Sequence, residues 1–207
     1  MLPWLKRHRY AVLAVLAMLG IVPGYLWPYS LSGASAAPTI LVRDTVIVNR
    51  AAYDLRLPYC RIGVRIASPR RGDIVLARLP DVPRPAFKRV IGLPGETIEV
   101  RENRVLIDGR PLPVQPLSAS DFTWVPPAHR MGSTVVMEDG HWAAYTPGAN
   151  PDRNSAPRRL APGEYFLMGD NRDNSLDSRA FGPVDRDSIV GKSIAVLRTG
   201  PRVRGPG

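Results

Sequence analysis

The residues best suited to chemistry lie in one polar run, Gly169-Asp170-Asn171-Arg172-Asp173-Asn174-Ser175-Leu176-Asp177-Ser178-Arg179. Asp and Asn side chains bond nearby backbone amides, so the run predicts a tight turn that satisfies its own polar groups. Such a turn would hold two serine hydroxyls in fixed places, with ion pairs between its alternating acidic and Arg side chains. The run is too polar for a core and too rich in charge for an ordinary loop. It therefore favours a functional site, with a purely structural turn as the alternative.

Lysine is the second chemical signal, because it is scarce. The chain has 28 Lys and Arg residues, and only Lys6, Lys88 and Lys192 are Lys. A Lys kept in an Arg-rich chain can indicate a need for an amine that loses its proton, which Arg cannot do. Lys6 belongs to a basic tail, and Lys192 lies in a predicted turn. Lys88 interrupts an apolar, strand-like run and is either a general base or an edge-strand lysine that discourages aggregation.

Residues 10 to 27 form an uncharged stretch of 18 residues. As a helix it would reach about 27 Å at ~1.5 Å per residue, close to the ~30 Å of a hydrocarbon core. Trp27 and Tyr29 suit the interface belt, and the cluster Lys6-Arg7-His8-Arg9 favours a cytoplasmic N-terminus. We therefore expect a basic cytoplasmic tail over 1–9, a transmembrane anchor over 10–28, and the remainder outside the cell membrane.

A cleavable secretory signal is the competing interpretation of the N-terminus. A basic region, an apolar region and Ala34-Ser35-Ala36 together match the pattern of a signal with an Ala-x-Ala cleavage site. The segment from residue 22 to 36 is long and aromatic for a cleavage region, which favours the anchor.

Composition limits the partners. The formal net charge is +10, but Arg is scattered among Asp and Glu, which favours an anionic membrane surface over nucleic acid. The single cysteine, Cys60, can form no internal disulfide. Three scattered His and one Cys argue against a zinc site, and we expect neither a metal nor a cofactor.

Beyond residue 38 the pattern is β throughout, with short runs rich in Val and Ile between Gly, Pro and Asp turns. Nine of the 22 prolines fall between Pro111 and Pro162, which predicts an irregular insertion with its own hairpin. We expect a mainly β fold with a catalytic β domain over 29–110 and 163–207, and the insertion over 111–162. The predicted strands are 40–49, 73–78, 86–92, 97–100, 104–108, 134–138, 142–146, 164–168 and 188–198.

Five blocks resemble, in order and spacing, the type I signal peptidases, which are membrane-anchored serine proteases with a Ser/Lys catalytic pair. The blocks are 35–40, Asp44 with 46–49, 71–76 (Arg-Gly-Asp-Ile-Val-Leu), 88–95 (Lys-Arg-Val-Ile-Gly-Leu-Pro-Gly) and 169–179. The resemblance implies the signal-peptidase-like β fold, in which a smaller β subdomain is inserted between the Lys-bearing strand and the Gly-Asp-Asn-Arg turn.

By position, the resemblance makes Ser35 the nucleophile and Lys88 the general base, and Ser175 matches the hydroxyl that orients the amine. A free Lys with a pKa of ~10.4 is neutral in only about one molecule in 2,500 at pH 7. Burial against apolar neighbours such as Phe87 would have to lower that pKa.

Four further residues of the polar run match supporting positions of the family. Asp177 and Arg179 correspond to an ion pair that supports the site, and Asp170 and Arg172 would brace the turn. A self-satisfied loop explains the same four residues, and both interpretations can hold together. Ser178 receives no role.

Two positions depart from the usual family pattern. Ala36 follows the nucleophile, where the family usually has Met, and leaves a smaller contact beside Ser35. Gly33 stands where some members carry an oxyanion-hole Ser, so the hole would be built from backbone N–H groups, including that of Ser35. A Ser/His triad with His129 or His141 is an alternative, although surface His is the default.

The expected function is a serine endopeptidase that removes signal peptides from secretory preproteins after small residues of the Ala-x-Ala type. It would be a single-pass protein of the bacterial cytoplasmic membrane, with its catalytic domain on the periplasmic side. One alternative is a dedicated processing peptidase for a pilin or conjugation substrate. Another is a non-catalytic β-domain, membrane-tethered or secreted, which the intact set of Ser35, Lys88 and Ser175 argues against.

Overall fold

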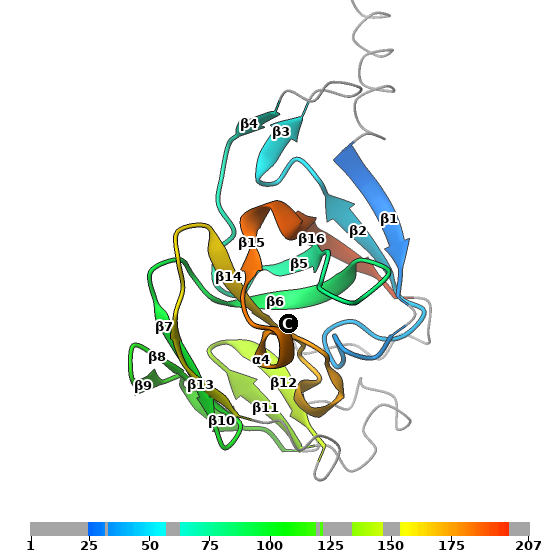
Figure 1. Cartoon of the computed structure of the whole chain (residues 1–207). Coiled ribbons are helices and arrows are strands. Elements are labelled where there is room, and N and C mark those ends of the chain that lie inside the picture. Colours follow the sequence, from blue (N-terminus) through cyan, green and yellow to red (C-terminus); the bar gives the residue numbers. More distant parts are fainter. Residues whose placement is uncertain are drawn as a thin grey trace, which may run out of the picture.

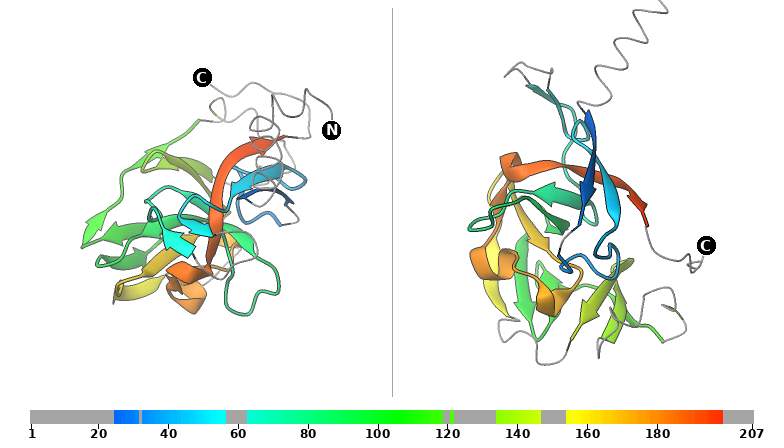
Figure 2. Two further views of the ribbon diagram at one scale, coloured as in Figure 1. Left: turned by 90° about the horizontal axis from the view of Figure 1, so that it is seen from above. Right: turned by 90° about the vertical axis from the view of Figure 1, so that its right-hand side faces the viewer.

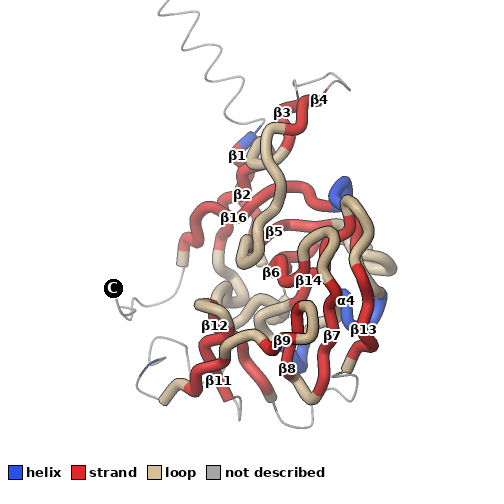
Figure 3. Tube along the Cα trace, turned by 90° about the vertical axis from the view of Figure 1, so that its left-hand side faces the viewer, coloured by secondary structure: helices blue, strands red, loops and turns tan. Residues whose placement is uncertain are grey.

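A computed structural model describes residues 25–31, 33–56, 63–118, 121, 134–146 and 154–198, and these are almost entirely strands and turns (Figure 1). The predicted mainly β class is therefore confirmed. The few helices are short pieces at the turns, as the tube in Figure 3 shows: η2 (Arg172–Asn174), α4 (Ser178–Phe181) and η3 (Arg186–Ser188).

The largest sheet has seven antiparallel strands in the order β1-β2-β16-β5-β6-β14-β15. Strand β6, which lies between β5 and β14, is buried at six of seven positions, as expected of a strand covered on both faces. The strands are β1 (Leu26–Ser30), β2 (Thr45–Asn49), β5 (Ile74–Ala77), β6 (Ala86–Gly92), β14 (Glu164–Met168), β15 (Val184–Asp185) and β16 (Ile189–Leu197).

Two smaller sheets lie at the end of the molecule opposite β3 and β4 (Figures 1 and 2). One contains β13 (Ser155–Arg159), β7 (Thr97–Arg101), β8 (Arg104–Ile107) and β9 (Arg110–Pro111), and the other β10 (Val114–Pro116), β11 (Thr134–Glu138) and β12 (His141–Tyr145). Asp139 and Gly140, both with positive φ, close the β11–β12 hairpin as the Asp-Gly pair predicts. The remaining pair, β3 (Asp54–Arg56) with β4 (Gly63–Arg65), extends from the large sheet.

A shared core fixes the four-stranded sheet against the large one. Ile91, Phe166 and Met168 of the large sheet form one buried cluster with Ile98 and other apolar residues of β7 and β8. The approach is close enough that a Cβ on Gly92 would lie 2.6 Å from a carbon of Ile98. The four-stranded sheet thus begins at residue 97, within the segment that we assigned to the catalytic domain, and the division of the chain at 111 and 162 stays a prediction.

Three predicted strands, 86–92, 134–138 and 164–168, match the observed bounds, and most others differ by one or two residues. Residues 40–44 were wrongly predicted as strand. The Asp44 carboxylate accepts from the Leu41 amide at 2.9 Å and Arg43 has a φ of 76°, so the segment turns instead. Lys192 was wrongly placed in a turn: it belongs to β16, and its Nζ lies 2.6 Å from Asp73 Oδ1.

The predicted anchor extended too far. Its last residues, Leu26 to Pro28, form the start of β1, where Trp27 pairs with Val48 of β2. The Tyr29 ring packs edge-on against Phe87 with 6.4 Å between ring centroids, and its place in an interface belt stays a prediction. Residues 1–24 lie outside the described part of the chain. Within that part, we find no helix whose length and apolar character would let it cross a bilayer.

Candidate active site

Lys88 lies in the interior of the large sheet. Its strand, β6, is paired with β5 on one side and β14 on the other, so Lys88 is not an edge-strand lysine. The residue is only 3% exposed, and its Nζ donates a hydrogen bond to Ser175 Oγ at 2.8 Å. No ion pair to Lys88 occurs among the described residues.

Burial is the main reason that the pKa of Lys88 is lowered from 10.5 to about 8. The charge of Asp177 acts against this shift and that of Arg179 reinforces it, while Asp170 raises the pKa to a smaller extent. With a pKa of about 8, the amine of Lys88 is neutral in about one molecule in ten at pH 7, and only the neutral amine can accept a proton.

The 169–179 turn is held together by the Asp177 carboxylate. Asp177 Oδ2 accepts from the Gly169 amide at 3.0 Å, and its Oδ1 accepts from Arg179 Nε at 2.8 Å. Burial alone would favour the neutral acid, but the bonds and charge of Arg179 outweigh it and lower the pKa of Asp177. The predicted pairing of Asp177 with Arg179 is therefore present, and it closes the turn on which Ser175 stands.

Ser178, which received no role from the sequence, has a structural one. Its Oγ accepts a hydrogen bond from the Leu167 amide at 2.9 Å, within a fully buried environment. This bond ties the start of α4 to β14, the strand beside β6, and so fixes the turn relative to Lys88.

Asp170 pairs with Arg89, the residue that follows Lys88. Arg89 Nε and Nη2 contact Asp170 Oδ1 and Oδ2 at 2.7 and 2.6 Å, in a bidentate, almost fully buried pair. Thr39 Oγ1 also donates to Asp170, and Arg89 Nη1 donates to the Gly72 carbonyl at 2.8 Å. The sequence analysis missed Arg89 and Thr39. Both lie in the blocks that carry the family resemblance, and that position was the available signal.

Arg172 forms a second buried pair, with Glu138 at the end of β11. This partner also escaped the sequence analysis, because nothing local distinguishes Glu138 from a surface carboxylate on a hairpin.

The loop that carries Ser35 rests on the 169–179 turn. Asn171 donates from its backbone N to the Ser35 carbonyl at 3.1 Å and from its Nδ2 to the Ala34 carbonyl at 3.2 Å. A Cβ on Gly169 would lie 2.3 Å from Ser175 Oγ and 2.5 Å from the Ser35 carbonyl oxygen. Ser35 and Ser175 therefore pack against the same Cα, and only glycine fits there.

The positions beside Ser35 are occupied as follows. Ala36 is buried and belongs to the core cluster that contains Phe87, whereas Gly33 is exposed with open space where a side chain would stand. His141 lies over Gly72, with its Nδ1 3.0 Å from the Glu138 carbonyl oxygen. His129 lies outside the described residues. Within the described ranges no group of His, Cys, Asp and Glu could hold a metal ion.

These features define a mainly β protein with a buried lysine that is hydrogen-bonded to a serine, and comparison with known proteins identifies the family. A family model described as signal peptidase, peptidase S26, matches residues 3–198. Signal peptidase I of Pseudomonas aeruginosa is 31% identical over 218 aligned residues, which cover 96% of this chain and 74% of that protein. Signal peptidase IB of Staphylococcus aureus is 32% identical over 171 residues, which cover 80% of this chain and 74% of that protein.

Among solved structures, a crystal structure of signal peptidase I from Enterococcus faecalis is 32% identical and covers 62% of this chain and 99% of its own. Its TM-score of 0.37 is too low to support the fold by itself. The family model and the two relatives show that the chain belongs to the signal peptidase family, peptidase S26. It is a serine endopeptidase of the signal peptidase type.

Proposed function

We propose that this peptidase removes signal peptides with a Ser35/Lys88 catalytic pair. Lys88 is the observation that carries the proposal. Its amine is buried and hydrogen-bonded to the Ser175 hydroxyl, and burial lowers its pKa to about 8. A buried lysine of lowered pKa does not stabilise the fold better than an apolar residue would. A general base, by contrast, requires a lowered pKa in order to be neutral before it accepts a proton.

In the proposed reaction, neutral Lys88 takes the proton of Ser35 Oγ as that oxygen attacks the scissile carbonyl carbon. The resulting ammonium then gives a proton to the departing amine, and an ester links Ser35 to the signal peptide. A water molecule then loses a proton to the same amine and attacks the ester. The bond from the acyl carbon to Ser35 Oγ breaks, Lys88 returns the proton to Ser35 Oγ, and the signal peptide leaves as a carboxylic acid. No cofactor enters these steps.

Ser175 would orient the amine of Lys88, since it accepts the hydrogen bond of Nζ at 2.8 Å. The pair of Asp177 with Arg179 would hold Ser175 in place, and the pair of Asp170 with Arg89 would hold the turn beside β6. The tetrahedral oxyanion would be bound by backbone N–H groups that include that of Ser35, with the exposed Gly33 leaving room at the site.

The decisive experiment uses the purified full-length chain and a bacterial preprotein whose signal ends in Ala-x-Ala. Ser35→Ala and Lys88→Ala should each lower turnover by about 10³-fold or more, and the double variant should be no worse, because residues that act as one unit lose their effect together. Lys88→Arg should be equally inactive, since Arg keeps its proton. Substantial turnover by Lys88→Ala would refute the pair.

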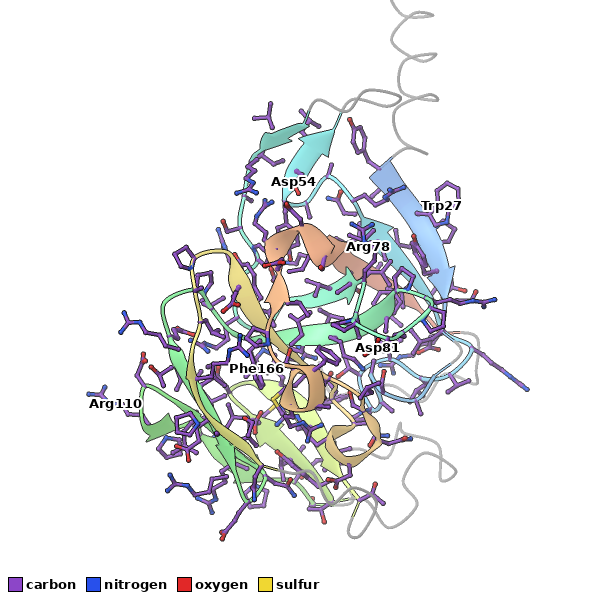
Figure 4. All side chains as sticks on the ribbon, in the orientation of Figure 1. Trp27, Asp54, Arg78, Asp81, Arg110 and Phe166 are labelled. Carbon is purple, nitrogen blue, oxygen red and sulfur yellow. The ribbon has the colours of Figure 1, made fainter. Side chains whose placement is uncertain are left out.

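We also propose that residues 10–24 anchor the enzyme in the bacterial cytoplasmic membrane, with tail 1–9 inside and the catalytic domain on the periplasmic side. The uncharged segment and the basic tail support this topology. So does Trp27, which is 49% exposed where β1 begins and which Figure 4 labels on that outer strand. Protease added to intact spheroplasts should degrade the catalytic domain. Full protection of the domain would contradict the orientation.

A further inference from the structure

Glu138, Tyr145 and Arg172 form a buried polar cluster outside the reacting groups. Arg172 Nη1 donates to Glu138 Oε1 at 2.9 Å and to Tyr145 Oη at 3.0 Å, while Nη2 contacts Glu138 Oε2. The side chains of Arg172 and Glu138 are 3% and 2% exposed. Burial and the Glu138 charge raise the pKa of Tyr145 to about 12 despite the opposing charge of Arg172, so its phenol stays protonated.

The cluster joins two parts of the chain. Glu138 is the last residue of β11, where it pairs with His141, and Tyr145 is the last residue of β12, where it pairs with Thr134. Arg172 belongs to η2 in the 169–179 turn. Backbone contacts reinforce the connection: the Ala144 amide donates to the Asp170 carbonyl at 2.7 Å, and the Thr146 amide donates to Asp173 Oδ2 at 2.6 Å. The end of β12 is therefore bound along the first half of the turn.

Arg172 is also connected, through hydrogen bonds, to the residues around Lys88. Its carbonyl oxygen accepts a hydrogen bond from Arg179 Nη2, and Arg179 holds Asp177. Ser175 follows Arg172 after the single turn of η2. A displacement of Arg172 would therefore move the Asp177–Arg179 ion pair, whose charges act on Lys88. It would also move the Ser175 hydroxyl, which is hydrogen-bonded to Lys88.

From this geometry we infer that Glu138 and Tyr145 are positioning residues of the peptidase, which act through Arg172 to hold Ser175 against Lys88. The inference rests on the proposed Ser35/Lys88 function. It assigns the β11–β12 hairpin a part in catalysis, although neither residue touches the reacting atoms.

Directional bonding is the reason that this cluster does more than fill space. The bidentate pair with Glu138 fixes the position and orientation of the Arg172 guanidinium. Two apolar side chains of similar volume would fill the same space, but their contacts have no preferred direction. Replacing such a pair by apolar residues often preserves stability. Stability and positioning can therefore be separated by experiment.

The test combines Glu138→Leu with Arg172→Met in the full-length chain, and measures the melting temperature, kcat, KM and the pH–rate profile on a preprotein. We expect a melting temperature near that of the wild type, a fall in kcat of about tenfold or more, and a KM within about threefold. The midpoint of the pH–rate profile should move to higher pH. A loosened turn admits water to Lys88, whose charge balance otherwise involves Asp170, Asp177 and Arg179.

A matched control is the pair of Asp54 with Arg186, 2.8 Å apart, at the base of the β3–β4 extension (Figure 4 labels Asp54). Asp54→Leu with Arg186→Met should leave both kcat and the pH–rate midpoint at the wild-type values. A kcat and midpoint equal to those of the wild type in a folded Glu138→Leu/Arg172→Met variant would overturn the inference.

Tyr145→Phe decides the case if the double variant fails to fold, because it keeps the ring and removes only the hydroxyl. We expect a threefold or larger fall in kcat with a shifted midpoint, and wild-type values would overturn the inference. Lys88→Ala is assayed in parallel. If Lys88→Ala is active, the proposed function fails. If Lys88→Ala is inactive while the hairpin variants behave as the wild type, only the positioning inference fails.

Discussion

Replacing Lys88, the proposed general base, should stabilise the folded chain at neutral pH. Burial lowers the pKa of Lys88 from 10.5 to about 8. Each factor of ten in the dissociation constant corresponds to about 1.4 kcal/mol, so a protonated Lys88 costs the folded state about 3 kcal/mol. Lys88→Met removes this cost and loses the hydrogen bond to Ser175, worth about 1 kcal/mol. We expect a net gain of about 2 kcal/mol, together with complete loss of turnover.

The gain should depend on pH in a defined direction. The folded-state pKa lies below the unfolded value, so the destabilisation is fully present below about pH 8 and disappears as the pH rises toward 10.5. At about 2–4 °C per kcal/mol for a chain of this size, Lys88→Met should melt about 4–8 °C higher than the wild type at pH 7. The difference should shrink or reverse near pH 10.5.

Thermal melting in detergent, followed by circular dichroism at both pH values, measures the effect. Lys192→Met is the matched control, because Lys192 forms an ion pair with Asp73 at 2.6 Å and lowers the pKa of that carboxyl, which burial alone would raise. It should give no stabilisation. A melting temperature for Lys88→Met that is unchanged at pH 7, or raised equally at both pH values, would refute the assignment of a buried, readily neutralised amine.

Three further substitutions test the 169–179 turn. Ser175→Ala should reduce stability by only about 1 kcal/mol but lower kcat far more and shift the pH–rate midpoint; near-wild-type turnover would remove Ser175 from the site. Asp177→Ala leaves Arg179 buried without its carboxylate, so we expect a loss of about 3–5 kcal/mol in thermal or urea unfolding, with activity lost as a consequence. Gly169→Ala would place a Cβ 2.3 Å from Ser175 Oγ and 2.5 Å from the Ser35 carbonyl, and steady-state kinetics should show kcat falling more than tenfold; unchanged kinetics would show that the loop and the turn do not need this contact.

Local physics made much of the strand pattern predictable. Segments 86–92, 134–138 and 164–168 were bounded correctly, because short runs of apolar, aromatic or β-branched residues between Gly, Pro and Asp turns are recognisable without tertiary information. Two of the errors arose where tertiary contacts decided the outcome. Leu26 to Pro28 continue an apolar stretch and suit a membrane helix, but pairing with β2 makes them a strand. Lys192 has turn-like neighbours, but the contact with Asp73 holds it in β16.

The sequence by itself predicted which residues react. The scarcity of Lys indicated Lys88 and the polar run at 169–179 contains Ser175, and the family resemblance of the ordered blocks assigned roles to Ser35, Lys88 and Ser175. The family resemblance that these residues carried agrees with the comparisons.

The tertiary structure decided their chemical state. A lysine becomes a base near neutral pH only when surrounding chain excludes water, and that burial comes from β5, β14 and the turn that follows β14. The pairs of Asp170 with Arg89 and of Arg172 with Glu138 join residues separated by 81 and 34 positions. No local pattern encodes such partners, because a charged side chain selects its partner by proximity in the folded protein, where burial makes an unpaired charge too costly to keep.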